Sequence, residues 1–119
     1  MIKGIDVSAW NGNINWSAAK NDIDFAIIRA GFGREVEQKD TEFENNYKGC
    51  KENDIPVGAY WYSYALTPEE AVIEAKVCIE ILKNKEFELP IFYDIEEKET
   101  LKQGQQKVSD IADAFCEEL

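Results

Sequence analysis

The sequence predicts an α/β protein built from parallel β/α units, and three observations support this fold class. Four short apolar runs, rich in β-branched and aromatic residues, alternate with four stretches of helical periodicity. No linker, low-complexity tract or repeat interrupts the 119 residues, so we expect residues 1–119 to form a single domain. Strands that alternate with helices pair in parallel through right-handed crossovers. The candidate architectures are therefore a small doubly wound sheet and part of a β/α barrel.

The first half of the chain contains two of these units. The first strand is predicted at residues 3–8 and is followed by a short helix near residues 16–20. The second strand, residues 24–33, ends in a glycine-rich stretch. A helix is predicted at residues 41–53 because Phe43, Tyr47 and Cys50 recur on one stripe.

The second half contains the other two units. The third strand is predicted at residues 55–65, and the helix behind it begins with Thr67 as N-cap, Pro68 in the first turn and Glu70 completing a capping box. The fourth strand is predicted at residues 89–96 and the last helix from about residue 103. The expected buried faces of these two helices are Ala71, Val72, Ala75, Cys78, Ile79 and Leu82, and Val108, Ile111, Ala112, Phe115 and Leu119.

Composition excludes several function classes. The chain has 24 acidic and 13 basic residues and a net charge of −11, which argues against nucleic acid as a partner. The absence of histidine excludes His-based catalytic triads and His metal sites. The three widely spaced cysteines are expected to be small buried residues on helices. No apolar run approaches the ~20 residues of a membrane span, and no signal peptide is visible, so no membrane association is expected.

Acidic residues follow the fourth strand in the segment PIFYDIEEKE. Side chains alternate along a strand, so Asp94 and Glu96 should share one face while Glu97 points the other way. Asp6 lies near the carboxyl end of the first strand. Because ligands of parallel α/β folds bind at the carboxyl ends of the strands, we expect these three acids at one functional edge.

Neighbouring carboxylates resist ionising together, so one should keep its proton toward neutral pH. A protonated and an ionised carboxyl group are what glycosidases use. The alternatives are a solvated strand end and a Mg²⁺ or Ca²⁺ site, which we place lower because no Asn/Gly-rich ligand loop is present. Tyr60, Tyr62 and Tyr64 share a strand face and suit either a core or a sugar platform. Arg29, in an apolar strand, should pair with a carboxylate, which either belongs to the site or is structural.

These residues lie in segments that resemble glycoside hydrolase family 25, the lysozymes that cut peptidoglycan. The resemblance runs from the opening GIDVSAWNGNINW through DFAIIRAGFG and DTEFENNYKGCKENDIPVGAYWYSYA to PIFYDIE. The opening segment together with the later DIE is the specific part. The resemblance implies hydrolysis of the β-1,4 bond between N-acetylmuramic acid and N-acetylglucosamine, without a metal or an organic cofactor.

The resemblance also implies roles for individual residues. Glu96 would be the acid that protonates the glycosidic oxygen, and Asp94 would position or polarise the N-acetyl group of the substrate. Asp6 would line the same site. The expected substrate-binding residues are Tyr62, Tyr60, Arg29 and Trp10. The implied partner is the glycan strand of bacterial peptidoglycan, and the implied location is extracellular or at the cell wall.

The length of the chain corresponds to about half of such a barrel, since a full β/α barrel takes about 250 residues. We therefore expect a C-terminally truncated catalytic domain with four strands, two unpaired sheet edges and one uncovered sheet face. Exposed edges invite pairing with another chain, so we hypothesise a homodimer. The alternatives are a doubly wound sheet partly covered by the last helix and, for function, an inactive fragment that only binds glycan or is a structural remnant.

Overall fold

The computed structural model describes residues 2–119 and contains four strands with helices between them. The strands are β1 (Gly4–Val7), β2 (Phe25–Phe32), β3 (Val57–Tyr62) and β4 (Ile91–Asp94). The helices are α1 (Trp16–Ala19), α2 (Phe43–Glu52), α3 (Pro68–Leu82), α4 (Lys98–Leu101) and α5 (Gln105–Glu118), with 3-10 turns η1 (Ala9–Asn11) and η2 (Val36–Gln38). Each predicted strand and helix is present, with narrower bounds, and α4 was not predicted.

The four strands form one parallel sheet in the order β1-β2-β3-β4. Their carboxyl ends therefore lie along the same edge of the sheet. The ladder between β3 and β4 ends where Tyr62 pairs with Asp94. A register shift between Arg29 and Gly31 bends β2 close to its carboxyl end. The predicted parallel α/β fold is confirmed.

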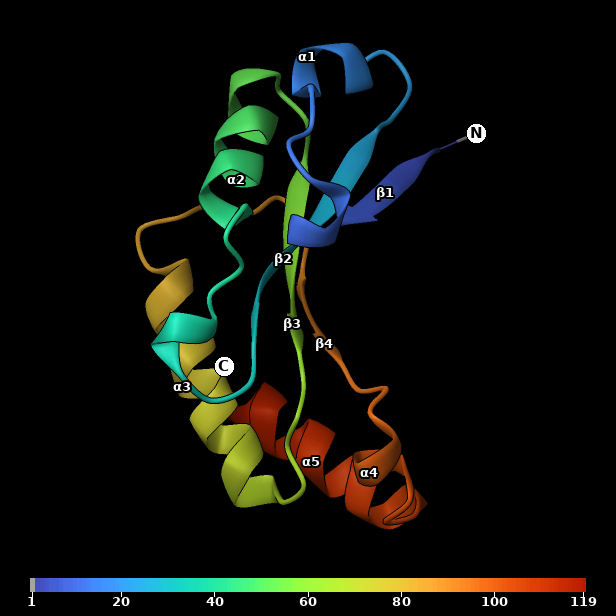
Figure 1. Cartoon of the computed structure of the whole chain (residues 1–119), viewed down its shortest axis with the longest axis vertical. Coiled ribbons are helices and arrows are strands. Elements are labelled where there is room, and N and C mark those ends of the chain that lie inside the picture. Colours follow the sequence, from blue (N-terminus) through green and yellow to red (C-terminus); the bar gives the residue numbers. More distant parts are fainter. Residues whose placement is uncertain (1) are drawn as a thin grey trace.

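The hydrophobic core lies on one face of this sheet only. Alternate residues of β2 and β3, such as Ile28 and Trp61, are fully buried and belong to one cluster with residues of α2, α3 and α5. Figure 1 shows α2 and α3 together to one side of the strands. On the opposite face, Phe92 is 47% exposed and Asp6 is exposed. Helices on a single face correspond to the barrel-type alternative and not to a doubly wound sheet.

Helix α5 closes the end of this core next to β4. The ring of Phe115 stacks on the ring of Tyr93, with centroids 3.8 Å apart and planes 7° from parallel. Within the predicted apolar face of this helix, Ile111 and Phe115 are buried, but Leu119 is 45% exposed because the helix ends at Glu118 and the last residue projects beyond the core. The sequence prediction for Leu119 was therefore wrong.

Helix α3 begins as predicted, with one difference in its cap. The Thr67 side chain accepts a hydrogen bond from the backbone N–H of Glu70, and Pro68 stands in the first turn. The Glu70 side chain does not complete a capping box, because it accepts from the backbone N–H of Leu66 at 2.7 Å instead. Ile79, which was expected to be buried, is exposed, and Ile81 is buried in its place.

The cysteines do not behave as a group. Cys50 on α2 and Cys78 on α3 are buried, as expected, but Cys116 on α5 is exposed. Cys116 directly follows the buried Phe115, so it projects toward solvent on the outer side of the helix. Burial raises the pKa of the Cys50 and Cys78 thiols to about 12, which makes both unreactive.

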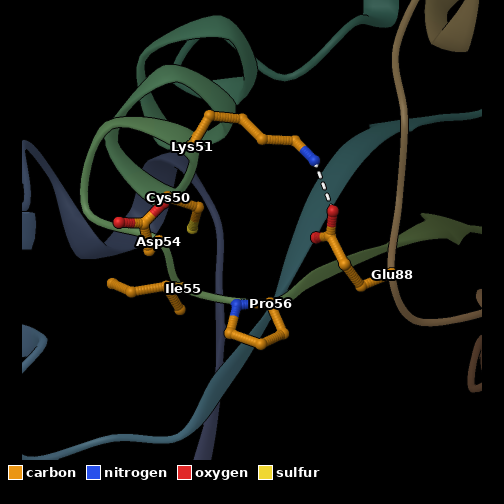
Figure 2. A pocket seen from close by; sticks show the side chains of 6 residues that line it. All are labelled: Cys50, Lys51, Asp54, Ile55, Pro56 and Glu88. Carbon is orange, nitrogen blue, oxygen red and sulfur yellow. Dashed lines mark hydrogen bonds and ion pairs between the residues drawn. The ribbon is translucent and has the colours of Figure 1, made fainter.

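The amino end of β3 holds a small cavity of about 230 Å³ next to the C-terminal turn of α2. Figure 2 shows Glu88 facing Lys51 across this cavity. The Lys51 ammonium donates to Oε2 of Glu88 at 2.7 Å, and the backbone N–H of Val57 donates to Oε1 of the same carboxylate at 3.1 Å. Glu88 therefore joins α2 to the start of β3, at the sheet edge opposite the predicted acidic site.

None of the helices in residues 2–119 has the length and apolar character needed to cross a bilayer.

Candidate active site

The predicted acids meet in a cavity of about 410 Å³ at the carboxyl ends of the strands. Asp6 from β1, Asp94 from β4 and Glu96 from the segment after β4 all line it. Two strands separate β1 from β4 in the sheet, so the acids share one cavity only because all four strands end at one edge. Tyr60 and Phe92 complete the wall on the open face of the sheet. The sequence prediction that these three acids converge is confirmed.

Asp94 and Glu96 line the same cavity, where Glu96 affects the ionisation of Asp94. The pKa of Asp94 is raised to about 6, first by burial and then by the hydrogen bond and negative charge of Glu96 and by the charge of Asp6. A carboxyl group that keeps its proton at weakly acidic pH can donate it in a reaction. The raised pKa of Asp94 is in the direction expected for one of two neighbouring acids.

Tyr62 lies at the same edge and contacts a residue that sequence reasoning placed elsewhere. The Tyr62 hydroxyl donates to Oε2 of Glu97 at 2.7 Å. This hydrogen bond is the first cause that raises the pKa of the Tyr62 hydroxyl, followed by burial and the charges of Glu97 and Glu96. The prediction that Glu97 points away was wrong because β4 ends at Asp94, and strand alternation does not continue past that residue.

Arg29 has a carboxylate partner, but the partner is not one of the three acids. The Nε of Arg29 donates to Oδ2 of Asp40 at 2.7 Å, and the side chain of Asp40 is fully buried. Asp40 also accepts backbone N–H groups of Ala9 and Glu42. The Arg29 pair therefore joins η1 and the segment that leads into α2 to β2. Asp40 was missed because nothing in its local sequence marks it as buried.

Trp10 does not line the acidic cavity. It stands on η1 with 88% of its surface exposed and borders a second cavity of about 390 Å³, together with Ala9, Arg29, Phe32 and Tyr64. The rings of Phe32 and Tyr64 meet edge to face at 6.0 Å. Of the predicted substrate-binding residues, Tyr60 thus lies at the acids, Tyr62 at their rim, and Arg29 and Trp10 beside them.

A fourth carboxylate, Glu74 of α3, was not predicted to matter and is fully buried behind the site. It accepts hydrogen bonds from the Ser63 hydroxyl at 2.9 Å, the Tyr64 backbone N–H at 2.8 Å and the Tyr93 hydroxyl. Burial raises its pKa above the ordinary value. Glu74 therefore fixes the carboxyl ends of β3 and β4 to α3. A glutamate at an apolar helical spacing, between Ala71 and Cys78, was the available signal.

Within residues 2–119, no three acidic or cysteine side chains converge in a geometry that would hold a metal ion. The chemistry open to this arrangement is proton transfer between carboxyl groups and a substrate bound over the tyrosines.

Comparison with known proteins gives consistent results. A family model for glycosyl hydrolases family 25 matches residues 5–119. Lysozyme M1 of Streptomyces globisporus is 41% identical over 63 residues, which are 52% of this chain and 21% of that protein. Autolysin LytC of Streptococcus pneumoniae, solved with a synthetic peptidoglycan ligand, has a TM-score of 0.82 at 29% identity and covers 98% of this chain and 29% of its own. A family 25 glycosyl hydrolase of Bacillus anthracis has a TM-score of 0.81 at 26% identity, covering 100% of this chain and 55% of its own. The chain thus spans less than two thirds of each of these proteins.

Proposed function

The chain belongs to glycosyl hydrolase family 25, and from this premise we propose that residues 1–119 are the first half of a catalytic domain that hydrolyses peptidoglycan. The bond that we propose is cut is the β-1,4 linkage between N-acetylmuramic acid and N-acetylglucosamine. The single observation that carries the proposal is the convergence of Asp6, Asp94 and Glu96 in one cavity at the carboxyl ends of the strands. The action we propose is lysis of the cell wall, and the place of action is extracellular or at the wall.

In this proposal, Glu96 is the general acid and Asp94 assists the N-acetyl group of the substrate. When the acetamide N–H of the bound sugar donates to Asp94, the hydrogen bond favours the ionised form of Asp94. In the proposed complex, Glu96 carries the catalytic proton and lies close to the glycosidic oxygen. The acetamide oxygen attacks the anomeric carbon as the glycosidic bond breaks, and Glu96 gives its proton to the leaving oxygen. Water then attacks the anomeric carbon, the bond to the acetamide oxygen breaks, and Glu96 takes a proton from the water. Such substrate assistance is a known exception to the scheme with two catalytic carboxylates.

Asp6 has a supporting part in this scheme. It lines the cavity from β1, and its negative charge contributes to the raised pKa of Asp94. Tyr60 and Tyr62 present aromatic surface at the same edge for the sugar ring. The glycan strand of peptidoglycan is the partner we propose, which agrees with the peptidoglycan ligand in the LytC structure.

A second candidate function is glycan binding without turnover. The observation that favours it is the short span of the chain, which covers 29% of LytC and 55% of the Bacillus anthracis enzyme.

The sheet also has an open face that bears Ile27 and Phe92, and β1 and β4 are its outer strands. We propose that a second copy of the chain pairs with one of these outer strands, which leaves the acidic cavity open. Light scattering at high protein concentration tests this, and a monomer there contradicts the dimer.

Cell-wall clearing tests the proposed function. We would compare the chain with Glu96→Gln from about pH 4 to about pH 7, which brackets the pH at which the carboxyl pair titrates. The control is Glu99→Gln, an exposed glutamate on α4 outside the cavity. Clearing by the chain and the control, but not by Glu96→Gln, supports the proposal. If all three fold, bind muropeptide and fail to clear, the binding function is the correct one. Equal clearing by Glu96→Gln removes Glu96 from the role of acid.

A further inference from the structure

Three side-chain oxygens behind the active site form a buried triangle. Oε1 of Glu74 is 2.9 Å from the Ser63 hydroxyl and also contacts the Tyr93 hydroxyl, and these two hydroxyls are 2.8 Å apart. Oε2 of the same carboxyl group accepts the backbone N–H of Tyr64 at 2.8 Å. Three hydrogen bonds along the sides of the triangle need three protons, and the two hydroxyls supply only two.

A protonated Glu74 supplies the third proton. An ionised carboxylate only accepts, so both hydroxyls would donate to it, and the contact between Ser63 and Tyr93 would then have no proton. When Glu74 carries a proton, each oxygen of the triangle can donate once and accept once. The Glu74 side chain is fully buried and forms no ion pair within residues 2–119, as suits a neutral group.

The groups packed around Glu74 are compatible with this neutral state. Burial raises the pKa of Glu74 above its ordinary value, and the hydrogen bonds that it accepts oppose this only in part. The charge of Arg34 also opposes it, as the last of the causes, and that guanidinium is already in an ion pair. One turn along α3, burial raises the pKa of the Cys78 thiol to about 12. The pKa of the Tyr93 hydroxyl is raised first by burial and, from α5, also by Cys116.

The same carboxyl group holds the stretch that follows β3. It contacts the Ser63 hydroxyl and accepts the backbone N–H of Tyr64. The Ser63 hydroxyl in turn accepts the backbone N–H of Ala65 at 3.1 Å. These three residues directly follow the last residue of β3. The course of the stretch therefore depends on Glu74.

Both ends of the segment that carries Glu96 are bonded to this stretch. At its start, the backbone N–H of Ser63 donates to the backbone oxygen of Asp94 at 2.9 Å. At its end, the buried hydroxyl of Thr100 on α4 donates to the backbone oxygen of Ala65 at 2.8 Å. Glu96 lies between these two hydrogen bonds and lines the acidic cavity.

Tyr93 provides a second connection between Glu74 and the acids. It directly precedes Asp94 on β4, and neighbouring side chains of a strand point to opposite faces. Glu74 bonds the Tyr93 hydroxyl, and Phe115 stacks on its ring, so the strand is held from the helix side. The backbone that directs the Asp94 carboxyl group into the cavity is thereby fixed.

We propose that Glu74 is a positioning residue for the reaction, and that it acts as a protonated carboxyl group that fixes the stretch after β3 and, through it, Asp94 and Glu96. Glu74 does not touch the substrate, because it is fully buried. The inference rests on the proposed function for its reaction. The placement of the two acids can nevertheless be measured in a chain that does not turn over.

Nuclear magnetic resonance of the carboxyl carbons measures the protonation of Glu74 and Asp94 in one titration. In the parent chain, Glu74 should titrate at higher pH than Glu117, an exposed glutamate on α5 in the same spectrum. Asp94 should titrate near pH 6, as its surroundings dictate. Titration of Glu74 together with Glu117 overturns the protonated state.

Variants of the triangle test its connection to the acids. Tyr93→Phe removes one hydroxyl and keeps the ring on Phe115, so Asp94 should move in its cavity and bind its proton about tenfold more weakly. Glu74→Ala should have at least this effect, whereas Glu74→Gln, which is neutral and can both donate and accept, should restore the parent value. The control is Ile81→Ala, which opens the core on α3 without removing any of these hydrogen bonds and should leave the titration of Asp94 unchanged.

An unchanged Asp94 titration in Tyr93→Phe overturns the positioning role, and this variant decides the question if Glu74→Ala does not fold. An equal change in Ile81→Ala overturns it too, because lost stability alone would then explain the effect. Where the chain clears cell walls, Tyr93→Phe should lower the rate and shift its pH profile in the same direction as Asp94. If the titrations are as expected and the parent clears nothing, the proposed catalysis fails while the role of Glu74 in placing the acids stands.

Discussion

Asp94→Asn should stabilise the chain near neutral pH and leave its stability almost unchanged in acid. In the folded chain the pKa of Asp94 is raised to about 6 from the ordinary value of 3.8, by burial and by Glu96 and Asp6. The folded state therefore holds this proton more tightly than the unfolded state. The stabilisation that comes from this bound proton is fully present below the ordinary pKa of 3.8. It is lost as pH rises through the pKa that Asp94 has in the folded chain. Asparagine is neutral at every pH and does not incur this loss.

The size of the effect follows from the interval between the two pKa values. One proton held over that interval corresponds to at most about 3 kcal/mol in the free energy of unfolding. Asp94 lines an open cavity and is only partly buried, so water screens the charge and we expect about half of that value. The unfolding free energy of Asp94→Asn should thus rise relative to the parent by about 1.5 kcal/mol between about pH 4 and about pH 7.

Urea unfolding of both chains at several pH values in this range measures the difference directly. Asp113→Asn is the matched control, because Asp113 is an exposed carboxylate on α5 away from the cavity. Its difference from the parent should not change with pH. The reasoning is refuted if the difference in unfolding free energy between Asp94→Asn and the parent is the same at all pH values. It is also refuted if the parent becomes more stable relative to the variant as pH rises.

Three further experiments test burial and packing in the fold, two by substitution and one by thiol labelling. Glu74→Ala removes the acceptor of three donors, of which one hydroxyl can still donate to the other, and should lower the unfolding free energy by about 2–4 kcal/mol. Glu74→Gln should cost roughly 1–2 kcal/mol, and equal losses would contradict the network. A thiol reagent should label Cys116 in the folded chain and Cys50 and Cys78 only on unfolding, because burial raises the pKa of both latter thiols; labelling of all three at one rate would disprove this burial. Gly31→Ala would place a Cβ 2.7 Å from a ring carbon of the β3 tryptophan and 2.8 Å from the backbone oxygen of Gln38, and should cost about 1–3 kcal/mol. An unchanged melting temperature would show that both neighbours can move.

The order of the elements and the convergence of the acids could be predicted from the sequence. Both follow from local patterns, since apolar periodicity determines the element type and parallel strands end at one edge. The cap at Thr67 was predictable for the same reason, because the side chain bonds within its own turn. The family resemblance assigned roles to Glu96 and Asp94 that spacing alone left open.

What could not be predicted depends on contacts between distant segments. Asp40 as the partner of Arg29 requires the chain after β2 to fold back over that strand, which no local pattern reveals. The contact of Glu97 with Tyr62 depends on where β4 ends, and strand ends are the least certain part of a pattern-based prediction. Trp10 was assigned to substrate binding without a place, and only the structure separates its cavity from that of the acids.

The sequential order of the sheet has a consequence for how the chain acquires its structure. Every strand pairs only with its nearest neighbour along the chain, so each pairing closes a loop no longer than one β/α unit. Loops of this kind cost little entropy and favour rapid folding. A sheet with this order can assemble as the ribosome releases the chain, because each new strand adds to an edge that is already formed. The outer edge of β4 is then the last part of this sheet to form, and within residues 2–119 no strand pairs with it.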